Sequence, residues 1–121
     1  THQVGHIVDF MPTLLELAGA DYPREFNGHQ ILPHEGKSLA PIFRGQKREG
    51  HDALYWALMG NRAVRRGDWK LVWSADHDHW ELYNLRDDRT ETNNLASQHP
   101  DKVQKLAAMW DAWAKRVEVA E

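Results

Sequence analysis

The chain has 121 residues, of which 41% are hydrophobic and 27% are charged, a composition typical of an ordered globular domain. Its formal net charge of −3, without a long basic run, argues against nucleic acid as a partner, and no apolar run approaches the ~20 residues that cross a bilayer. The absence of cysteine excludes disulfides, zinc–thiolate sites and a cysteine nucleophile.

A helix is predicted near the start of the chain, over residues 7–18. Asp9 stands where an N-cap is expected, and Pro12 lies in the first turn, where its missing N–H is tolerated. Gly19 is a typical C-terminal stop. The apolar residues at helical spacing are Phe10, Leu14, Leu17 and Ala18.

The segment after this helix lacks apolar periodicity. Residues 20–38 are rich in Pro, Gly, Asn and His and predict a surface loop. One short helical turn is expected around Pro41, within residues 38–43, and the polar residues 44–51 predict a connector. We therefore interpret residues 1–50 as a helix with connecting loops, and residues 51–121 as a separate part of the chain.

The second part begins with short β-prone segments. Trp69, Leu71 and Trp73 fall on one face by period two, and Gly67 supplies a tight turn just before them. The strand segments are residues 54–56, 62–66, 69–73 and 80–83. Their short connections predict an antiparallel meander of three or four strands.

A longer helix is predicted at the end of the chain. Pro100 lies in its first turn, and Lys115 and Arg116 complement the helix dipole in its last turn. Its apolar stripe comprises Val103, Leu106, Ala107, Trp110, Trp113, Ala114 and Val117. Because a small sheet is marginal without cover, this stripe is expected to pack on it, which makes the fold class α+β.

Few residues have the pattern of a catalytic or metal site. His77 and His79 could share one face of a strand and bind a metal, but zinc needs three or four ligands, so a solvated hairpin loop is the favoured interpretation. Asp87 and Asp88 are interpreted as a solvated turn. No serine lies in a Gly-x-Ser-x-Gly elbow. We therefore assign no catalytic, cofactor or metal-binding residue.

The chain contains six tryptophans. Five of them are expected in the core: Trp69, Trp73, Trp80, Trp110 and Trp113. Trp56 lies outside this periodic set and just before a turn, so it is the candidate for a sugar-stacking platform.

Four stretches occur in an order that indicates a family. Residues 6–19 read His-Ile-Val-Asp-Phe-Met-Pro-Thr-Leu-Leu-Glu-Leu-Ala-Gly, and residues 36–39 read Gly-Lys-Ser-Leu. Residues 60–72 hold Gly-Asn-Arg-Ala-Val-Arg and Gly-Asp-Trp-Lys-Leu-Val, and residues 80–96 run from Trp-Glu-Leu-Tyr-Asn-Leu to Asn-Leu-Ala. Together they resemble the C-terminal subdomain of type I sulfatases, the family that contains the arylsulfatases.

This resemblance implies a small antiparallel sheet of about four strands packed by the C-terminal helix, within an alkaline-phosphatase-like parent whose large domain takes up the helix and loops of residues 1–50. The implied parent activity is hydrolysis of sulfate esters with calcium and a formylglycine made from a Cys/Ser-x-Pro-x-Arg motif. That motif is missing here, and the calcium ligands would precede Thr1. The chain is therefore expected to be inactive alone.

One departure from the family concerns the cleft. Many relatives carry Glu-His-Glu before Gly-Asn-Arg, where this chain has Ala57, Leu58 and Met59. The resemblance implies that this strand faces the active site, so an apolar wall is expected. The candidate cleft-wall residues are Trp56, Leu58, Met59, Asn61 and Arg62.

The resemblance also implies partners: an N-terminal catalytic domain of the same polypeptide and a sulfated small molecule or glycan. It favours a periplasmic or secreted location, although Thr1-His2-Gln3 has the features of neither a signal peptide nor a start codon. An exposed apolar helix predicts self-association of the isolated chain. The alternative is a free-standing carbohydrate-binding or protein-interaction module.

Overall fold

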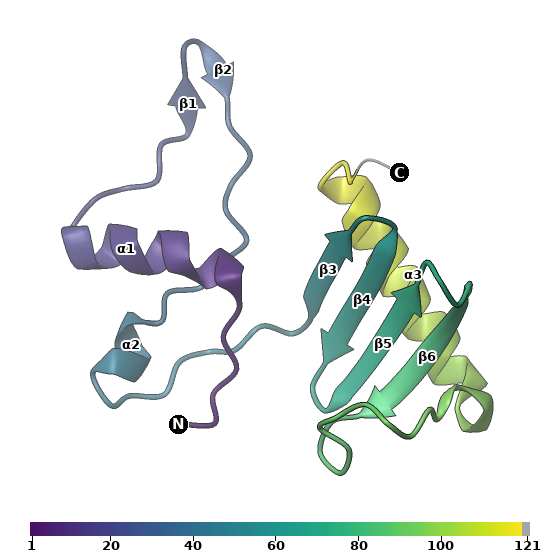
Figure 1. The fold of residues 1–121 in the computed structure, drawn as a ribbon. Coiled ribbons are helices and arrows are strands. Elements are labelled where there is room, and N and C mark those ends of the chain that lie inside the picture. The colour runs from purple at the N-terminus through teal and green to yellow at the C-terminus, as the bar shows by residue number, and fades with distance from the viewer. Residues whose placement is uncertain (120–121) are drawn as a thin grey trace. The chain divides into compact units, whose positions relative to one another are not determined.

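The computed structural model describes residues 1–119, which form two compact units, residues 1–51 and the residues from Asp52 onward (Figure 1). We describe each unit by itself. Within residues 1–119, no helix is both long enough and apolar enough to span a membrane.

The first unit is built around one helix. A 3₁₀ turn, η1 (Ile7–Asp9), leads into α1 (Phe10–Ala18), which ends at Gly19 with φ 65°, as the sequence predicts. Asp9 occupies the N-cap position of α1, but its side chain makes no capping hydrogen bond to the helix. The predicted N-cap position is thus confirmed, and the carboxylate forms its bonds in the interior of the unit instead. The expected short turn is α2 (Ala40–Phe43).

A small hairpin interrupts the segment that was expected to be only loop. Strands β1 (Glu25–Phe26) and β2 (His29–Gln30) pair antiparallel around Asn27 and Gly28, with φ 50° and 78°. Positive φ at both central residues is the geometry of a type I′ turn, for which Asn-Gly is the preferred sequence. The dipeptide was therefore a readable hairpin signal that apolar periodicity alone did not detect.

The second unit is a four-stranded antiparallel meander, as predicted (Figure 1). Its strands are β3 (Leu54–Leu58), β4 (Asn61–Arg66), β5 (Trp69–Ser74) and β6 (His79–Asn84), in that order across the sheet. Two-residue turns join β3 to β4 and β4 to β5, and Gly67 takes φ 59° in the second of them. Short turns fix the register, which places Val64, Leu71 and Leu82 in one row across the sheet.

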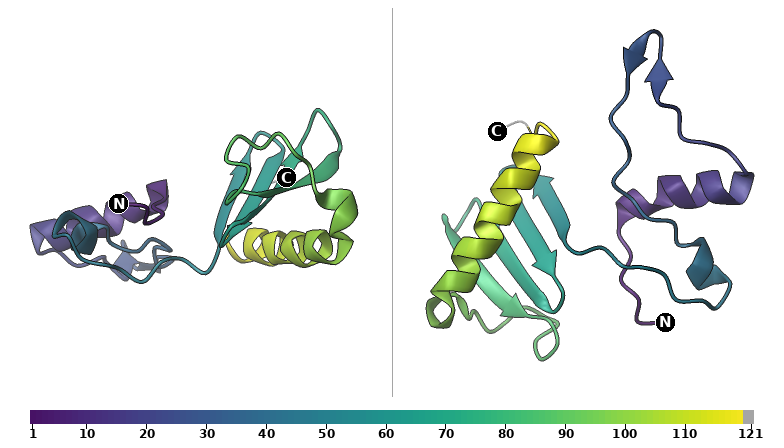
Figure 2. Two further views of the ribbon diagram at one scale, coloured as in Figure 1. Left: turned by 90° about the horizontal axis from the view of Figure 1, so that it is seen from below. Right: turned by 180° about the vertical axis from the view of Figure 1, so that it is seen from behind.

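Helix α3 (Pro100–Arg116) lies across one face of this sheet (Figure 2). The buried core where the two layers meet comprises Val64, Leu71, Leu82, Leu106 and Trp110. Trp69, Trp80 and Trp113 pack against this core, and Trp73 meets Trp80 edge to face at 5.4 Å. The predicted α+β layer and the predicted inward tryptophans are therefore confirmed.

The segment between β6 and α3 follows the outer edge of the sheet. Leu82 in β6 donates its N–H to Asn94 Oδ1 at 3.2 Å, and its carbonyl accepts from Leu95 N–H at 2.8 Å. A second 3₁₀ turn, η2 (Ala96–Gln98), then leads into α3. One edge strand of the sheet is thus bonded by a loop of the same unit, whereas β3 forms the other edge and pairs with β4 alone among the described residues.

Candidate functional site

The tip of the β3–β4 hairpin presents apolar side chains to solvent. Leu58 is 69% exposed and Met59 is 90% exposed. Met59 and Gly60 have φ 49° and 78°, the two positive angles of a type I′ turn. Glycine and asparagine adopt this conformation readily, whereas methionine does so at a conformational cost. An apolar residue that is this exposed gains little from burial, and its positive φ adds a conformational cost.

A groove of about 620 Å³ lies between this hairpin and the last turns of α3. Its lining residues on the hairpin are Ala57 to Arg62, and those on the helix side are Trp110, Asp111, Ala114, Lys115, Glu118 and Val119. Trp110 fixes the hairpin to the helix, because its indole N–H donates to the Trp56 carbonyl at 2.9 Å.

Arg62 is the most strongly positioned cation of this groove. Its guanidinium carbon lies 4.9 Å from the ring centroid of Trp110 and 5.9 Å from that of Trp73. Two aromatic faces hold the planar guanidinium by cation–π attraction while its charge is retained. The groove also contains the cation Lys115 and the anions Asp111 and Glu118, so its charge is mixed.

The structure gathers four of the five predicted cleft-wall residues around the groove. Leu58, Met59, Asn61 and Arg62 line it. Trp56 does not, because its neighbour Tyr55 stacks on Trp113 of α3 at 5.1 Å, and alternation therefore turns Trp56 to the opposite face of the sheet. There Trp56 is 36% exposed.

Asn61 is engaged within the hairpin. Its side-chain amide donates to the Leu58 carbonyl at 3.1 Å, and its side-chain oxygen accepts from Ala75 N–H at 3.2 Å. The amide therefore closes the turn and ties it to the loop after β5. Among the predicted cleft-wall residues, this leaves Arg62 as the polar group and Met59 as the apolar group that can contact a ligand in the groove, because alternation gives the Leu58 side chain the same sheet face as Trp56.

A buried polar cluster holds the first unit together, and it was not predicted. Asp9 is fully buried, and both of its carboxylate oxygens are occupied. Oδ2 accepts from His6 N–H and Arg48 Nη2, each at 2.9 Å, and Oδ1 accepts from Lys37 N–H at 2.8 Å and lies 2.6 Å from His51 Nε2. His51 stands in the connector predicted over residues 44–51, and no sequence pattern indicates this contact.

The charge of Asp9 is maintained by these contacts. Burial alone would raise its pKa, but the hydrogen bonds from the N–H groups of Lys37 and His6, and from the His51 and Arg48 side chains, outweigh burial and lower the pKa to about 2. With both oxygens occupied, the carboxylate has no position left for a metal. Asp9 therefore organises the interior of the first unit.

Thr13 of α1 also belongs to the interior of the first unit. Its hydroxyl donates to the Asp9 carbonyl at 2.5 Å and accepts from Leu39 N–H at 2.8 Å. Arg48 and Lys37 reach Asp9 from positions 39 and 28 residues away in the sequence. No local pattern reveals such distant partners, although the sequence does show Asp9 and Thr13 four residues apart at helical spacing.

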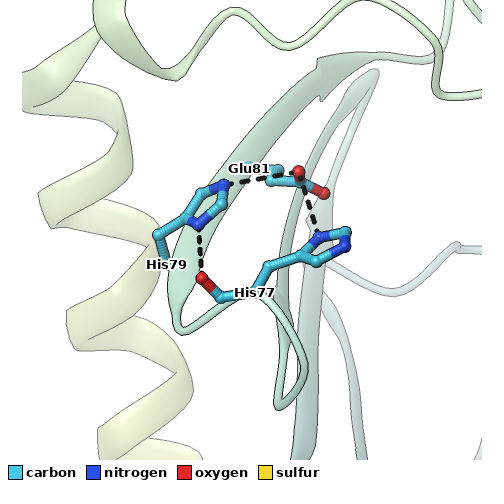
Figure 3. A group of neighbouring side chains, drawn as sticks. All are labelled: His77, His79 and Glu81. Carbon is cyan, nitrogen blue, oxygen red and sulfur yellow. Dashed lines mark hydrogen bonds and ion pairs between the residues drawn. The ribbon is translucent and has the colours of Figure 1, made fainter.

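The other polar candidates have structural roles or separate locations. Asp88 accepts from the N–H groups of Thr92 and Asn93, and the bond from Asn93 is the main cause that lowers its pKa, which fits the predicted turn. His77 and His79 lie close to each other and to Glu81 at the β5–β6 hairpin (Figure 3).

Comparison with known proteins identifies the family. The family model described as N-sulphoglucosamine sulphohydrolase, C-terminal, matches residues 1–116. This chain belongs to that family of sulfatase C-terminal domains. A sulfatase from Schizosaccharomyces pombe is 34% identical over 110 residues, covering 86% of this chain and 20% of the relative. An N-acetylglucosamine-6-O-sulfatase from Bacteroides thetaiotaomicron is 30% identical over 116 residues, covering 90% and 21%.

A solved structure agrees with this sulfatase assignment. A 2-O GAG sulfatase superimposes with a TM-score of 0.69 at 28% identity, over 92% of this chain and 25% of that chain. The chain spans about a fifth of the length of the curated relatives reported above. It is thus a C-terminal sulfatase segment, and its α+β sheet-and-helix layer has counterparts in solved sulfatases, which share the alkaline-phosphatase-like fold.

The residues of this chain do not fit the formylglycine and calcium of the sulfatase family. It has no cysteine, and none of its serines stands in a Ser-x-Pro-x-Arg sequence. Among the described residues, the group that could hold a cation is His77, His79 and Glu81, which is rich in nitrogen, whereas calcium takes oxygen ligands. Neither group can therefore be placed on this chain.

Proposed function

We propose that this chain completes the fold of a sulfatase and supplies one wall of its substrate cleft through the β3–β4 hairpin. The parent enzyme hydrolyses a sulfate ester, and the nucleophile and calcium ligands belong to an N-terminal catalytic domain of the same polypeptide. The chain alone is inactive, because it offers neither a group for covalent attack nor the oxygen ligands of the metal.

The observation that carries this proposal is Met59. A type I′ turn closed by Asn-Gly would be less strained, and a polar residue at 90% exposure would be better solvated. Met59 is instead an apolar side chain held outward beside Leu58. A contact made only in the complete enzyme explains this choice, because local stability does not.

The exposed apolar side of helix α1 is evidence for a large partner domain. Phe10, Leu14 and Leu17 lie at helical spacing and are 58%, 64% and 56% exposed. Contiguous exposed apolar area of this kind marks an interface. Because the chain matches about a fifth of each relative, the absent part of the parent is the occupant of choice. Residues 1–51 are therefore proposed to join the large domain, and the unit from Asp52 to form the C-terminal subdomain.

A sulfated glycan is the proposed substrate class. The names of two similar proteins, an N-acetylglucosamine-6-O-sulfatase and a 2-O GAG sulfatase, specify sugar sulfates. In this chain, Met59 offers an apolar surface for the C–H groups of a sugar ring, and the stacked Arg62 offers a guanidinium to an anionic substituent.

The first test is to read the coding sequence upstream of Thr1 and to assay both proteins. A Cys/Ser-x-Pro-x-Arg motif is expected upstream. The parent should hydrolyse sulfate esters, and the purified chain should show no turnover of an aryl sulfate above buffer. Turnover by the chain that survives repurification would overturn the assignment of the nucleophile to the missing domain.

The second test distinguishes a role of Met59 in the substrate cleft from an effect on folding. Met59→Asn in the parent should keep or improve stability, since asparagine suits the turn, but should raise KM for a glycan sulfate at least several-fold. Leu32→Asn is the matched control, because Leu32 is 67% exposed and lies in the other unit. Unchanged KM with Met59→Asn would remove the hairpin from the cleft.

A further inference from the structure

Three side chains converge at the β5–β6 hairpin (Figure 3). His79 and Glu81 lie two residues apart in β6 and share the sheet face opposite α3, and His77 reaches them from the turn. His77 Nδ1 is 3.6 Å from Glu81 Oε1, and His79 Nε2 is 3.5 Å from the same oxygen. The two imidazole rings are nearly parallel, with centroids 5.7 Å apart.

Hydrogen bonds orient two of these three groups. His79 Nδ1 lies 2.7 Å from the His77 carbonyl oxygen, which accepts only from a protonated nitrogen. In the neutral ring this bond leaves a lone pair on Nε2, the atom that faces Glu81 in Figure 3. A backbone carbonyl on the other ring nitrogen is the usual arrangement of a metal-binding histidine.

Glu81 is oriented in the same manner. Its Oε2 accepts from the Tyr83 hydroxyl at 2.9 Å, so that Oε1 is left facing the two imidazoles. Tyr83 is 7% exposed, so this support comes from a fixed side chain.

We propose that His77, His79 and Glu81 form a binding site for a divalent d-block cation of the Zn²⁺ type. Bonds of about 2.0–2.2 Å from zinc to nitrogen and oxygen place tetrahedral ligands about 3.3–3.5 Å apart. The separations of 3.5 and 3.6 Å to Glu81 lie at and just above the upper end of this range, and all three ligand atoms lie within 4.8 Å of one another. A modest movement of His77, whose side chain is 57% exposed, closes the set.

The chemistry of the ligands selects the ion. Two imidazoles and one carboxylate suit zinc, nickel or copper, whereas calcium and magnesium prefer oxygen. The site therefore differs in kind from the calcium site implied for the parent sulfatase. Water supplies the fourth position, and the exposure of both histidines leaves the site accessible from solvent. Bound metal would tie the turn to β6 and stabilise the hairpin.

The rival account is a pair of histidine–glutamate ion bridges, and pH distinguishes the two. A metal takes the same imidazole lone pairs that protons take, so metal binding weakens in acid, whereas the ion bridges do not compete with protons. The inference uses residues of the second unit only, and it does not depend on the proposed function.

Calorimetric titration of the 121-residue chain with Zn²⁺ at pH 7.5 tests the proposal. One site should be lost in the double variant His77→Ala/His79→Ala and weakened at least tenfold in Glu81→Gln. Tyr83→Phe should weaken binding by about 10–100-fold without removing a ligand. His29→Ala is the matched control, because His29 is an exposed histidine on β2 of the other unit. This variant should bind Zn²⁺ as tightly as the unmutated chain.

Two further measurements report the folding of the variants and the geometry of the bound metal. Tryptophan fluorescence checks that each variant is folded, and Co²⁺ absorption reports the tetrahedral geometry. Zinc binding should survive excess Ca²⁺ and decline between pH 7.5 and 5.5. The proposal is overturned if the folded double variant binds Zn²⁺ as tightly as the unmutated chain, if Ca²⁺ displaces the zinc, or if zinc binding strengthens at pH 5.5.

Discussion

The two units of this chain are stabilised in opposite ways. In the unit from Asp52, a sheet and a helix bury aliphatic and aromatic side chains against each other, with Val64, Leu71 and Leu82 fully covered. In residues 1–51, the buried groups include a charged Asp9 and Thr13, while the apolar side chains of α1 are exposed. The second unit therefore has a hydrophobic core of its own, whereas the first is held by a buried polar cluster, and the partner for its exposed apolar residues is the one proposed above.

The largest expected effect on stability comes from removing Trp110, which lies in the core between the sheet and α3. Trp110→Ala should reduce the free energy of unfolding by about 4–6 kcal/mol, because about 3–5 kcal/mol comes from the cavity and about 1 kcal/mol from the hydrogen bond to the Trp56 carbonyl. Denaturant unfolding measures it. Lys105→Ala, at an exposed position of α3, should be nearly silent, and equal stability of the two variants would show that α3 is not docked.

The corresponding change in the first unit is polar. Asp9→Asn keeps the shape but leaves Arg48, whose side chain is 4% exposed, as a buried cation without its anion. Breaking a buried pair in this way should cost about 3 kcal/mol, confined to residues 1–51. Amide hydrogen exchange resolves the two units. Protection lost equally in the β-sheet would mean that the units are not independently stabilised.

Acid should destabilise the first unit through the groups that are buried in it. The folded pKa of Asp9 is about 2, against an ordinary 3.8, so the unfolded chain binds this proton more tightly. The contribution, about 2 kcal/mol, is full above about pH 4 and is lost as pH falls towards 2. Burial lowers the pKa of His6, which adds an earlier decline below its ordinary 6.5. Thermal melts from pH 7 to 2 measure both. In Asp9→Asn the step below pH 4 should vanish, and its persistence would contradict the assignment.

The smallest effect concerns the exposed side of α1. Leu14→Ser, at a position that is 64% exposed, should leave folding nearly unchanged but reduce self-association of the isolated chain. Sedimentation velocity at increasing concentration measures it, with Leu32→Ser as a control at an exposed apolar residue outside the helix. If the unmutated isolated chain stays monomeric at high concentration, the exposed side of α1 is not an interface.

The sequence predicts most of the second unit because its interactions repeat at short range. Alternating Trp69, Leu71 and Trp73 mark a strand, and the spacing from Val103 to Val117 marks a helix, because the period of an apolar pattern distinguishes the two. The groove residues Leu58 and Met59 were reached through the family resemblance, whereas periodicity alone gave no reason to select them.

The remaining features depend on contacts that no period encodes. Arg48 and His51 meet Asp9 across about 40 residues, and a polar residue in a loop has no pattern that names its partner. Glu81 was treated only as part of a strand. Its spacing of two from His79 was visible, but the proximity of His77 depends on the path of the hairpin turn, which the polar residues leave open.

The unequal edges of the sheet have a consequence for handling the protein. Because the Asn94–Leu95 segment already bonds Leu82, β6 is poorly suited to pair with a foreign chain. Strand β3 is the edge at which another β-strand can add, whether it comes from the parent polypeptide or from a misfolded neighbour. Production of the isolated domain should therefore be improved most by a charged residue on β3, placed where the hairpin tip and Trp110 are left intact.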